Sequence, residues 1–420
     1  MKGLVISWFF PPETSAEGLV AYKLLKASNN SYDVFSSNKA IWGYDVKTVC
    51  NSRNIVNYAF NAVNFSDWVQ MCLGLYNLKH DEYDFLMTRS MPPESHLVGL
   101  SIKSHNRELL WMASFGDPLA YNPYEVTNVV KNRRMLPQFL KSRILNNPRK
   151  WVPIISKIPY LKNNILSRML ELENKVFENA DLLIFPNKKQ CIYSLGTNYD
   201  TLKKKAVVLP HSYDLSELNS IQIDFDNMSS DRKYTFLYTG HLDSFRNPLS
   251  IIKAVELLLK KYPEMKNKVL FKFIGNIPDY YKNMVMIKNL YKNIVFLPPV
   301  NYDETLRQMK EADCLLHIDA EFKYDYDSNI FLASKLSDYM GCQKPILGIT
   351  AKGSPAYTIL KESNNLTFQN DDNDDYEAIA EGIKEYVDGN VSVNLESYKK
   401  YENTVIAAVL DDLVSRNCRS

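Results

Sequence analysis

The sequence lacks any long apolar run and any closely spaced pair of cysteines. No stretch approaches 18 consecutive apolar residues, so no segment is expected to span a bilayer. The opening MKGLVISWFF ends at a pair of prolines and is too short for the apolar region of a signal peptide. The six cysteines lie far apart, which is typical of reduced thiols in a cytosol. We therefore expect a cytoplasmic protein.

A recognisable metal site is also lacking. The six histidines form no HExxH motif and no paired spacing, which argues against zinc. Asp-x-Asp triplets occur, for example at 224–226 and 325–327, but an Asp-rich chain produces such triplets by chance, and a hard cation needs more oxygen ligands. We therefore predict an activity that needs neither a metal nor a cofactor.

The chain has little net charge overall, but its basic residues are concentrated in one segment. The formal net charge is only +2, which argues neither for nor against nucleic acid. Residues 126–170, the basic segment, contain ten basic residues and no acidic ones, interleaved with apolar and aromatic side chains. A solvated helical face is one interpretation; we favour the surface of an anionic membrane. Nucleic acid could use the same charge, but no nucleic-acid motif accompanies it, so no nucleic-acid partner is expected.

Short apolar runs alternate with helical patterns along most of the chain. A length of 420 residues exceeds what one hydrophobic core usually supports, so two domains are expected. Alternation of strands and helices predicts parallel sheets covered on both faces. The predicted strands are 4–9, 32–36, 83–88, 109–114, 181–185 and 206–209, then 235–239, 269–274, 294–297, 314–318 and 345–349.

The predicted fold is therefore α/β, with two facing, doubly wound, Rossmann-like domains. The first domain should cover 1–215, with the basic segment and the C-terminal helix 400–420, and the second 216–399. Residues 218–232 are expected to form a polar linker, and 394–416 a helix. Ligands of open parallel sheets bind at the carboxyl ends of the strands, so we expect the site in a cleft between the domains.

Two loops between a strand and a helix are candidate anion sites. In the first, Gly18 opens a helix, where free N–H groups and the helix dipole favour negative charge. In the second, Gly240 lets the backbone approach a ligand, and Arg246 precedes a helix, where a guanidinium can grip a phosphate. The alternatives are an ordinary tight turn and a surface arginine.

A third candidate lies in the segment 328–341. Ser334 suits a helix N-cap, which would leave the N–H groups of Lys335 and Leu336 free for a diphosphate. One turn further on, Asp338 would reach a pair of ribose hydroxyls. The alternative is a capped amphipathic helix that packs in the core.

In their order and spacing, these three segments resemble the family-four retaining glycosyltransferases of GT-B architecture. Residues 273–276, with Gly275, and 295–300, with Pro299 and Val300, also resemble segments that line the nucleotide base in that family. The resemblance implies transfer of a sugar, with retention, from a nucleotide-diphosphate sugar held by the second domain to an acceptor on the first. Together with the basic segment, it suggests a lipid-linked glycan acceptor at the inner face of the cell membrane, in surface-polysaccharide synthesis.

The resemblance also implies roles for single residues. Arg246 and Lys335 would neutralise the departing diphosphate, so that no divalent ion is required. Asp338 would hold the ribose. Asp117, directly after a strand of the first domain, would face the reacting sugar or acceptor; its alternative role is a turn residue before Pro118.

Two positions depart from the family pattern. His241 stands where the family usually has arginine, and Ile330 where it often has the first of two glutamates; a longer loop would let Asp325 or Asp327 supply that carboxylate. These departures leave two alternatives open beside the transferase. One is a nucleotide-sugar epimerase of the same fold. The other is a non-catalytic partner subunit of a glycosyltransferase complex.

Overall fold

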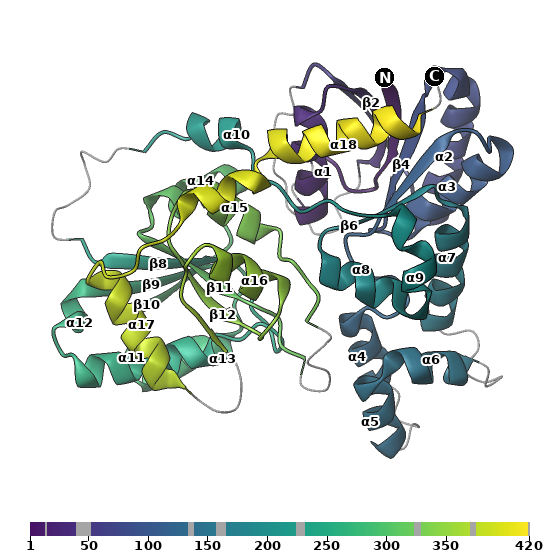
Figure 1. The fold of residues 1–420 in the computed structure, drawn as a ribbon. Helices are drawn as coiled ribbons and strands as arrows, with labels where there is room; N and C mark the ends of the chain where they lie inside the picture. The colour runs from purple at the N-terminus through teal and green to yellow at the C-terminus, as the bar shows by residue number, and fades with distance from the viewer. Residues whose placement is uncertain are drawn as a thin grey trace. The chain divides into compact units, whose positions relative to one another are not determined.

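The chain folds into two compact units (Figure 1). The structure is a computed structural model that describes residues 1–12, 15–38, 52–132, 138–156, 165–223, 232–322, 329–369 and 375–418. The first unit comprises Met1–Ser212 and Asn403–Ser420, and the second comprises Tyr213–Glu402. Each unit contains one parallel sheet with helices packed against it, which confirms the predicted pair of α/β domains.

The first unit is built on a sheet of order β3-β2-β1-β4-β5-β6-β7, in which all neighbours are parallel. Alternate side chains of each strand point to opposite faces, as Leu4 and Val5 of β1 do, and each face has its own core. The strands are β1 (Lys2–Ile6), β2 (Ser31–Ser37), β3 (Ile55–Phe60), β4 (Phe85–Arg89), β5 (Leu110–Ser114), β6 (Leu182–Phe185) and β7 (Ala206–Val208).

Helices cover both faces of this sheet. On one face α1 (Ala16–Ala27) and α18 (Asn403–Asn417) lie side by side, and both contribute apolar side chains to the core beneath them (Figure 1). The other face is covered by four helices, α2 (Phe65–Lys79), α3 (Glu94–His105), α7 (Ile165–Asn179) and α8 (Lys188–Leu195).

The basic segment forms further helices between β5 and α7. They are α4 (Pro123–Asn132), α5 (Gln138–Asn146) and α6 (Pro148–Ser156). Tyr121, Val126, Val130 and Ile144 are buried in a small core of their own. These helices thus pack on one another around that core and extend from the first unit (Figure 1).

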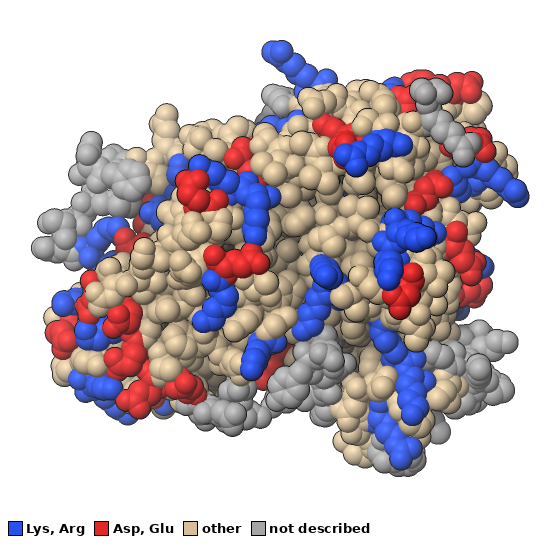
Figure 2. Space-filling model, viewed as in Figure 1, with Lys and Arg blue, Asp and Glu red and all other residues tan. Residues whose placement is uncertain are grey.

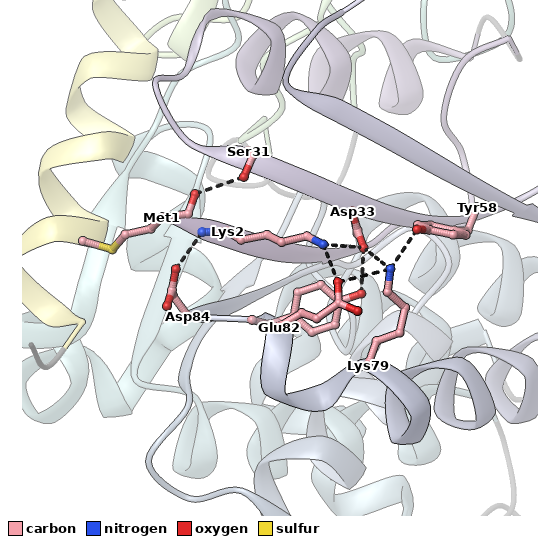
Figure 3. A network of polar contacts seen from close by, with 9 residues as sticks. Met1, Lys2, Ser31, Asp33, Tyr58, Lys79, Glu82 and Asp84 are labelled. Atoms are coloured by element: carbon pink, nitrogen blue, oxygen red, sulfur yellow. Dashed lines mark hydrogen bonds and ion pairs between the residues drawn. The ribbon is translucent and has the colours of Figure 1, made fainter.

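A network of hydrogen bonds and ion pairs among charged and hydroxyl groups links strands and helices at the amino edge of the first sheet (Figure 3). Asp33, 2% exposed, accepts hydrogen bonds from Lys79 Nζ at 3.0 Å and Tyr83 OH at 2.9 Å, and Lys2 Nζ lies 3.2 Å from it. Glu82 pairs with both lysines, at 2.6 and 3.3 Å. Burial raises the pKa of Asp33, but these partners lower it below its ordinary value, so the carboxylate stays ionised.

The second unit has a sheet of order β10-β9-β8-β11-β12-β13, again parallel throughout. Its strands are β8 (Tyr234–Thr239), β9 (Val269–Ile274), β10 (Ile294–Leu297), β11 (Cys314–Ile318), β12 (Ile346–Thr350) and β13 (Thr367–Gln369). One face packs against α11 (Leu249–Lys261), α13 (Asp279–Ile287) and α17 (Tyr376–Val387). The other packs against α14 (Tyr302–Glu311), α15 (Lys335–Gly341) and α16 (Pro355–Glu362).

The structure differs from the sequence expectation in three places. The strands β3 and β13 were not expected. The expected linker begins inside a helix, α10 (Leu215–Ser220). The expected helix 394–416 is two elements, a 3₁₀ helix (Leu395–Tyr401) and α18, separated at Glu402, whose backbone is extended and bridges to Tyr213.

Candidate functional site

Two glycines bring the backbone of the second unit close together at the carboxyl edge of its sheet. Gly240 follows β8 and Gly275 follows β9, and the Gly240 N–H donates to Ile274 O at 2.8 Å. Gly275 has φ +149°, and a Cβ there would lie 2.0 Å from Gly240 O. Only glycine therefore fits at 275, and the two loops expose backbone rather than side chain at this edge.

Lys335 and Arg246 share one corner of this edge. A Cβ on Gly240 would lie 2.5 Å from Lys335 Nζ, and that Nζ stands 4.0 Å from the centroid of the Tyr238 ring. Burial and the charge of Arg246 together hold the pKa of Lys335 well below 10.5, while Asp243 opposes them. Two cations at close quarters repel each other, so the corner favours an anion.

The position of Arg246 is set by a compact turn. Asp243 Oδ1 accepts the N–H groups of Phe245 and Arg246, each at 2.7 Å, and the Asp243 N–H donates to Arg246 O at 3.1 Å. An aspartate that bonds its own downstream backbone is typical of such turns. Sequence reasoning singled out Arg246 and missed Asp243, although the Asp-x-x-Arg spacing before a helix carries the signal.

Ser334 occupies the N-cap position of α15, but it lacks the capping bond that such a serine usually makes. The residue has helical backbone angles, and its side chain makes no capping bond. Its carbonyl instead accepts from Ser337, while the Leu336 N–H donates to Ala333 O at 3.0 Å and is not free. A hydrogen-bonded turn thus begins at Ala333, one residue before the serine that was expected to cap the helix. The charge of Lys335, rather than the amide of Leu336, is what this segment brings to the corner.

Asp338 lies on α15 and is 9% exposed. Tyr302 OH lies 3.5 Å from Asp338 Oδ2 and 3.3 Å from Glu217 Oε2. Burial first, and then the two carboxylates, raise the pKa of Tyr302 well above its ordinary value, so its hydroxyl keeps the proton. Tyr302, which contacts Asp338, and Glu217, which contacts Tyr302, are residues that sequence reasoning missed.

The other predicted residues of the second unit lie in different surroundings. His241 is exposed, directly after Gly240, and Pro299 and Val300 are exposed in the loop after β10. Ile330 is fully buried. Asp325 and Asp327 lie outside the described residues.

The first unit places Gly18 in the first turn of α1. Its N–H donates to Ser15 Oγ, the helix cap, at 3.2 Å, so the expectation of a free N–H there is wrong. A Cβ at Gly18 would lie 3.2 Å from backbone atoms of Phe10. Close packing against the end of the preceding segment is the observed use of this glycine.

Asp117 lies in a loop that directly follows β5. The Gly116 N–H donates to Ser90 Oγ at 3.0 Å. Gln190 Nε2 donates to Phe115 O at 3.0 Å and to Gly116 O at 3.1 Å. Buried side chains from neighbouring elements therefore hold the start of the loop.

Glu173 of α7 holds the other end of the Asp117 loop. Its Oε2 accepts the N–H groups of Leu119 at 3.0 Å and Ala120 at 3.2 Å, and the residue is only 1% exposed. Burial raises the pKa of Glu173 to about 7, although these two amides and Arg149 favour the ionised form. Glu173 is thus a buried residue that positions the Asp117 loop, and sequence reasoning did not identify it.

Within the described ranges, no group of three or more His, Cys, Asp or Glu side chains is placed to hold a metal ion. None of the described helices is long and apolar enough to cross a membrane.

Comparison with known proteins bears on both units. The family model for Glycosyl transferases group 1 matches residues 219–405. None of the curated proteins matches the sequence significantly. Among solved structures, HepE of Anabaena in complex with UDP has 13% identity and a TM-score of 0.61, over 99% of this chain and 100% of that one.

Two further structures are similar over nearly their whole length. Sucrose-phosphate synthase of Thermosynechococcus elongatus has 14% identity and a TM-score of 0.64, over 99% of this chain and 98% of that one. The lipopolysaccharide outer core galactosyltransferase WaaB, without ligand, has 11% identity and a TM-score of 0.57, over 99% of each chain. These likenesses confirm the predicted GT-B fold.

Proposed function

We propose that this glycosyltransferase moves a sugar from a nucleotide-diphosphate sugar, bound by its second unit, to a glycan acceptor, bound by its first. The enzyme class is supported by the family match over residues 219–405 and by the GT-B fold. The observation that carries the proposal is the corner where Lys335 and Arg246 meet beside the bare backbone of Gly240. A diphosphate brings the negative charge that this corner lacks.

The cationic corner suits the charge that develops during transfer. As the bond between the sugar and the diphosphate oxygen breaks, negative charge builds on the diphosphate, and fixed cations there stabilise the transition state without a metal ion. The acceptor hydroxyl forms the new bond to the same carbon and passes its proton to the departing diphosphate oxygen. We propose that it attacks from the side that the diphosphate leaves, with retention of configuration.

The nucleotide would lie along the carboxyl edge of the second sheet. Asp338, beside Tyr302, is the proposed partner of the ribose hydroxyls. The exposed loop with Pro299 and Val300 is the proposed neighbour of the base, close to Gly275. UDP is the first nucleotide to test, because HepE of Anabaena binds UDP.

Substitution of Arg246 tests the donor site. We expect Arg246→Ala to lower the rate of UDP release from a UDP-sugar at least about tenfold, equivalent to about 1.4 kcal/mol in the barrier. Arg232→Ala is the matched control, because Arg232 is exposed, lies just before β8 and pairs with Asp313. Equal rates for the two variants would remove Arg246 from the site.

We further propose that the basic segment holds the protein at an anionic membrane, where a lipid-linked acceptor is presented. Figure 2 shows Lys and Arg side chains on the extending helices, without Asp or Glu among them in that view. Arg143, Lys150 and Ile154 are exposed there. Arg149 stacks over the rings of Tyr121 and Tyr193, at 5.0 and 4.5 Å, and Arg143 lies over the ring of Trp151 at 5.3 Å, so both also serve packing.

Flotation with liposomes tests this membrane proposal. Each basic residue near an anionic surface contributes on the order of 1 kcal/mol, so removing two should clearly weaken binding. The variant Arg143→Ala/Lys150→Ala is compared with Lys203→Ala/Lys204→Ala, which removes the same charge from another exposed part of the first unit. Equal binding with and without anionic lipid would refute the proposal.

A further inference from the structure

The large apolar side chains that the second unit exposes are gathered in one stretch of its chain. Within the described part of that unit, the strongly exposed ones all lie between positions 280 and 300. Two belong to the end of β10 and the loop beyond it, and four belong to α13 and the turn that follows it. Single apolar side chains on a surface are ordinary, whereas a cluster marks a place of contact.

The helix α13 turns these side chains away from the core. It connects β9 with β10, the edge strand of the sheet (Figure 1). Its buried residues are Tyr281 and Val285. Tyr280 and Ile287 are seven residues apart, so they share one side of the helix. Ile287 is 84% exposed, and its neighbour Met286 is 62% exposed. We call four residues the α13 face: Tyr280, Met286, Ile287 and Tyr291.

Basic residues accompany the α13 face. Residues 280–302 contain three lysines and no acidic residue. Acidic residues outside this stretch meet two of the lysines: Lys282 Nζ lies 2.8 Å from Asp279 Oδ1, and Lys288 pairs with Glu256. The third, Lys292, directly follows Tyr291 and is exposed. The stretch therefore combines exposed apolar side chains with positive charge, as the basic segment of the first unit does.

Further lysines gather around Lys292 at the amino edge of the second sheet. Lys233 Nζ donates to the backbone oxygens of Lys266 and Lys292, each at 3.0 Å, so the three residues are neighbours. Lys266 is exposed, like Lys292. Burial first, and then the charge of Lys292, lower the pKa of Lys233 below its ordinary value. The edge next to Tyr291 is thus positively charged and favours a negatively charged surface.

This combination fits the headgroup region of an anionic bilayer. Aliphatic side chains can enter the boundary of the acyl chains, tyrosine rings favour the interface, and lysines reach the lipid phosphates. A second copy of the chain fits less well, because a two-fold contact would bring the same lysines face to face. A nucleic acid would attract the lysines but leave Met286 and Ile287 without an apolar partner.

We propose that the α13 face is a contact with an anionic lipid surface, made by the unit that holds the nucleotide sugar. Met286 and Ile287 insert between lipid headgroups, and Lys266 and Lys292 meet the lipid phosphates. The inference goes beyond the proposed function, which gives the second unit only the donor. It does not depend on the basic segment either, since that segment belongs to the first unit.

Flotation of the full chain with vesicles of phosphatidylcholine, with and without phosphatidylglycerol, tests the proposal. We expect Met286→Ser/Ile287→Ser to lower the partition coefficient onto the mixed vesicles about tenfold, because two apolar side chains no longer leave water. Val63→Ser/Leu78→Ser is the matched control. It removes side chains that are 73% and 82% exposed from the first unit, and it should bind as the wild type does.

A second pair of variants separates the charge from the apolar contact. Lys266→Ala/Lys292→Ala should weaken binding to the mixed vesicles roughly tenfold and leave the weak binding to phosphatidylcholine alone unchanged. Ile287→Leu keeps an apolar side chain and should bind as the wild type does. All of these positions are exposed, so thermal unfolding should be unchanged, which confirms that each variant is folded.

Three results would overturn the proposal. Met286→Ser/Ile287→Ser could float with the mixed vesicles as the wild type does, while Arg143→Ala/Lys150→Ala does not; the basic segment would then be the membrane contact. The Val63→Ser/Leu78→Ser control could lose as much binding as the α13 variant. Light scattering could show a dimer in solution that Met286→Ser/Ile287→Ser dissociates, and the α13 face would then be a contact between two copies of the chain.

Discussion

The carboxyl edges of the two sheets have the same architecture but different electrostatics: one is cationic and the other is balanced in charge. In the second unit, burial and then the charge of Arg246 hold the pKa of Lys335 well below its ordinary value. In the first unit, Arg89 is matched by Glu17, and His211 is neutral. Parallel strands thus deliver side chains to one edge in both units, but the charge balance at that edge indicates which ligand each can hold.

The loops at the two edges also differ in which groups they present and in how firmly side chains hold them. In the second unit, Gly240 and Gly275 expose backbone where a large anion could approach. In the first unit, buried side chains such as Gln190 and Glu173 fasten the loop that carries Asp117. A diphosphate is recognised mainly by charge and backbone, whereas a sugar needs side chains held in place, and this difference supports the proposed division of donor and acceptor between the two units.

The largest effect is expected from removing the charge of Lys335. Lys335→Met keeps most of the side-chain length, and we expect it to lower the rate of UDP release from a UDP-sugar about a hundredfold, the usual scale for losing one group that stabilises a developing anion. Steady-state kinetics measure this. Lys282→Met, at an exposed lysine of α13, is the control. A Lys335→Met enzyme with wild-type kinetics would contradict the electrostatic contrast between the two edges.

A smaller effect is expected from loosening the Asp117 loop. Glu173→Ala removes the acceptor of two backbone N–H groups, and we expect turnover to fall about tenfold, with a loss of about 1–3 kcal/mol in unfolding free energy. Glu173→Gln keeps the shape of the side chain and one oxygen that can accept a hydrogen bond. It should therefore retain more activity than Glu173→Ala, as kinetics and urea unfolding together would reveal.

The wild type and Glu173→Gln should also differ in how their free energy of unfolding depends on pH. Because burial raises the pKa of Glu173 from 4.5 to about 7, the folded state holds this proton more tightly than the unfolded state does. The wild type should therefore lose stability as pH rises from 4.5 to about 7, a dependence that Glu173→Gln should lack. Identical pH profiles for wild type and Glu173→Gln would show that Glu173 is not buried as described.

The smallest effect on activity is expected at the amino edge of the first sheet. Asp33→Asn breaks a buried ion pair, which should cost roughly 3 kcal/mol of unfolding free energy and leave the kinetics unchanged. Since the folded-state pKa of Asp33 lies below 3.8, its contribution is present above that pH and is lost as pH falls through the lowered value. Thermal unfolding and kinetics, measured on one sample of the variant, separate an effect on stability from an effect on activity. A large loss of turnover in folded protein would show that the amino edge of the first sheet is coupled to the active site.

Most of the fold could be predicted from the sequence because buried parallel strands are continuous apolar runs. The strands β8, β9, β10 and β11 lie within one residue of their predicted bounds. The strand β3 was missed because its residues are exposed or half-buried, and β13 because it has three residues. Neither carries the run of buried residues that makes a strand visible in a sequence.

The candidate site could be predicted only in part. Strand–loop–helix order pointed to Gly240, Arg246 and Lys335, which the fold brings together. The partnership of Tyr302 with Asp338, separated by 36 residues, depends on tertiary packing and leaves no local signal. Ser334 takes the expected N-cap position, but its side chain makes no capping bond because a turn has already begun at Ala333.

Calorimetry of UDP binding between about pH 7 and 9, in buffers that differ in ionisation enthalpy, tests the central claim most directly. UDP is fully ionised above about pH 7, since its second phosphate pKa is about 6. Binding should raise the depressed pKa of Lys335, so we predict net proton uptake and an affinity that weakens as pH rises towards 10.5, both lost in Lys335→Met. Binding of equal strength in both proteins, without proton uptake, would contradict a diphosphate at the Lys335–Arg246 corner.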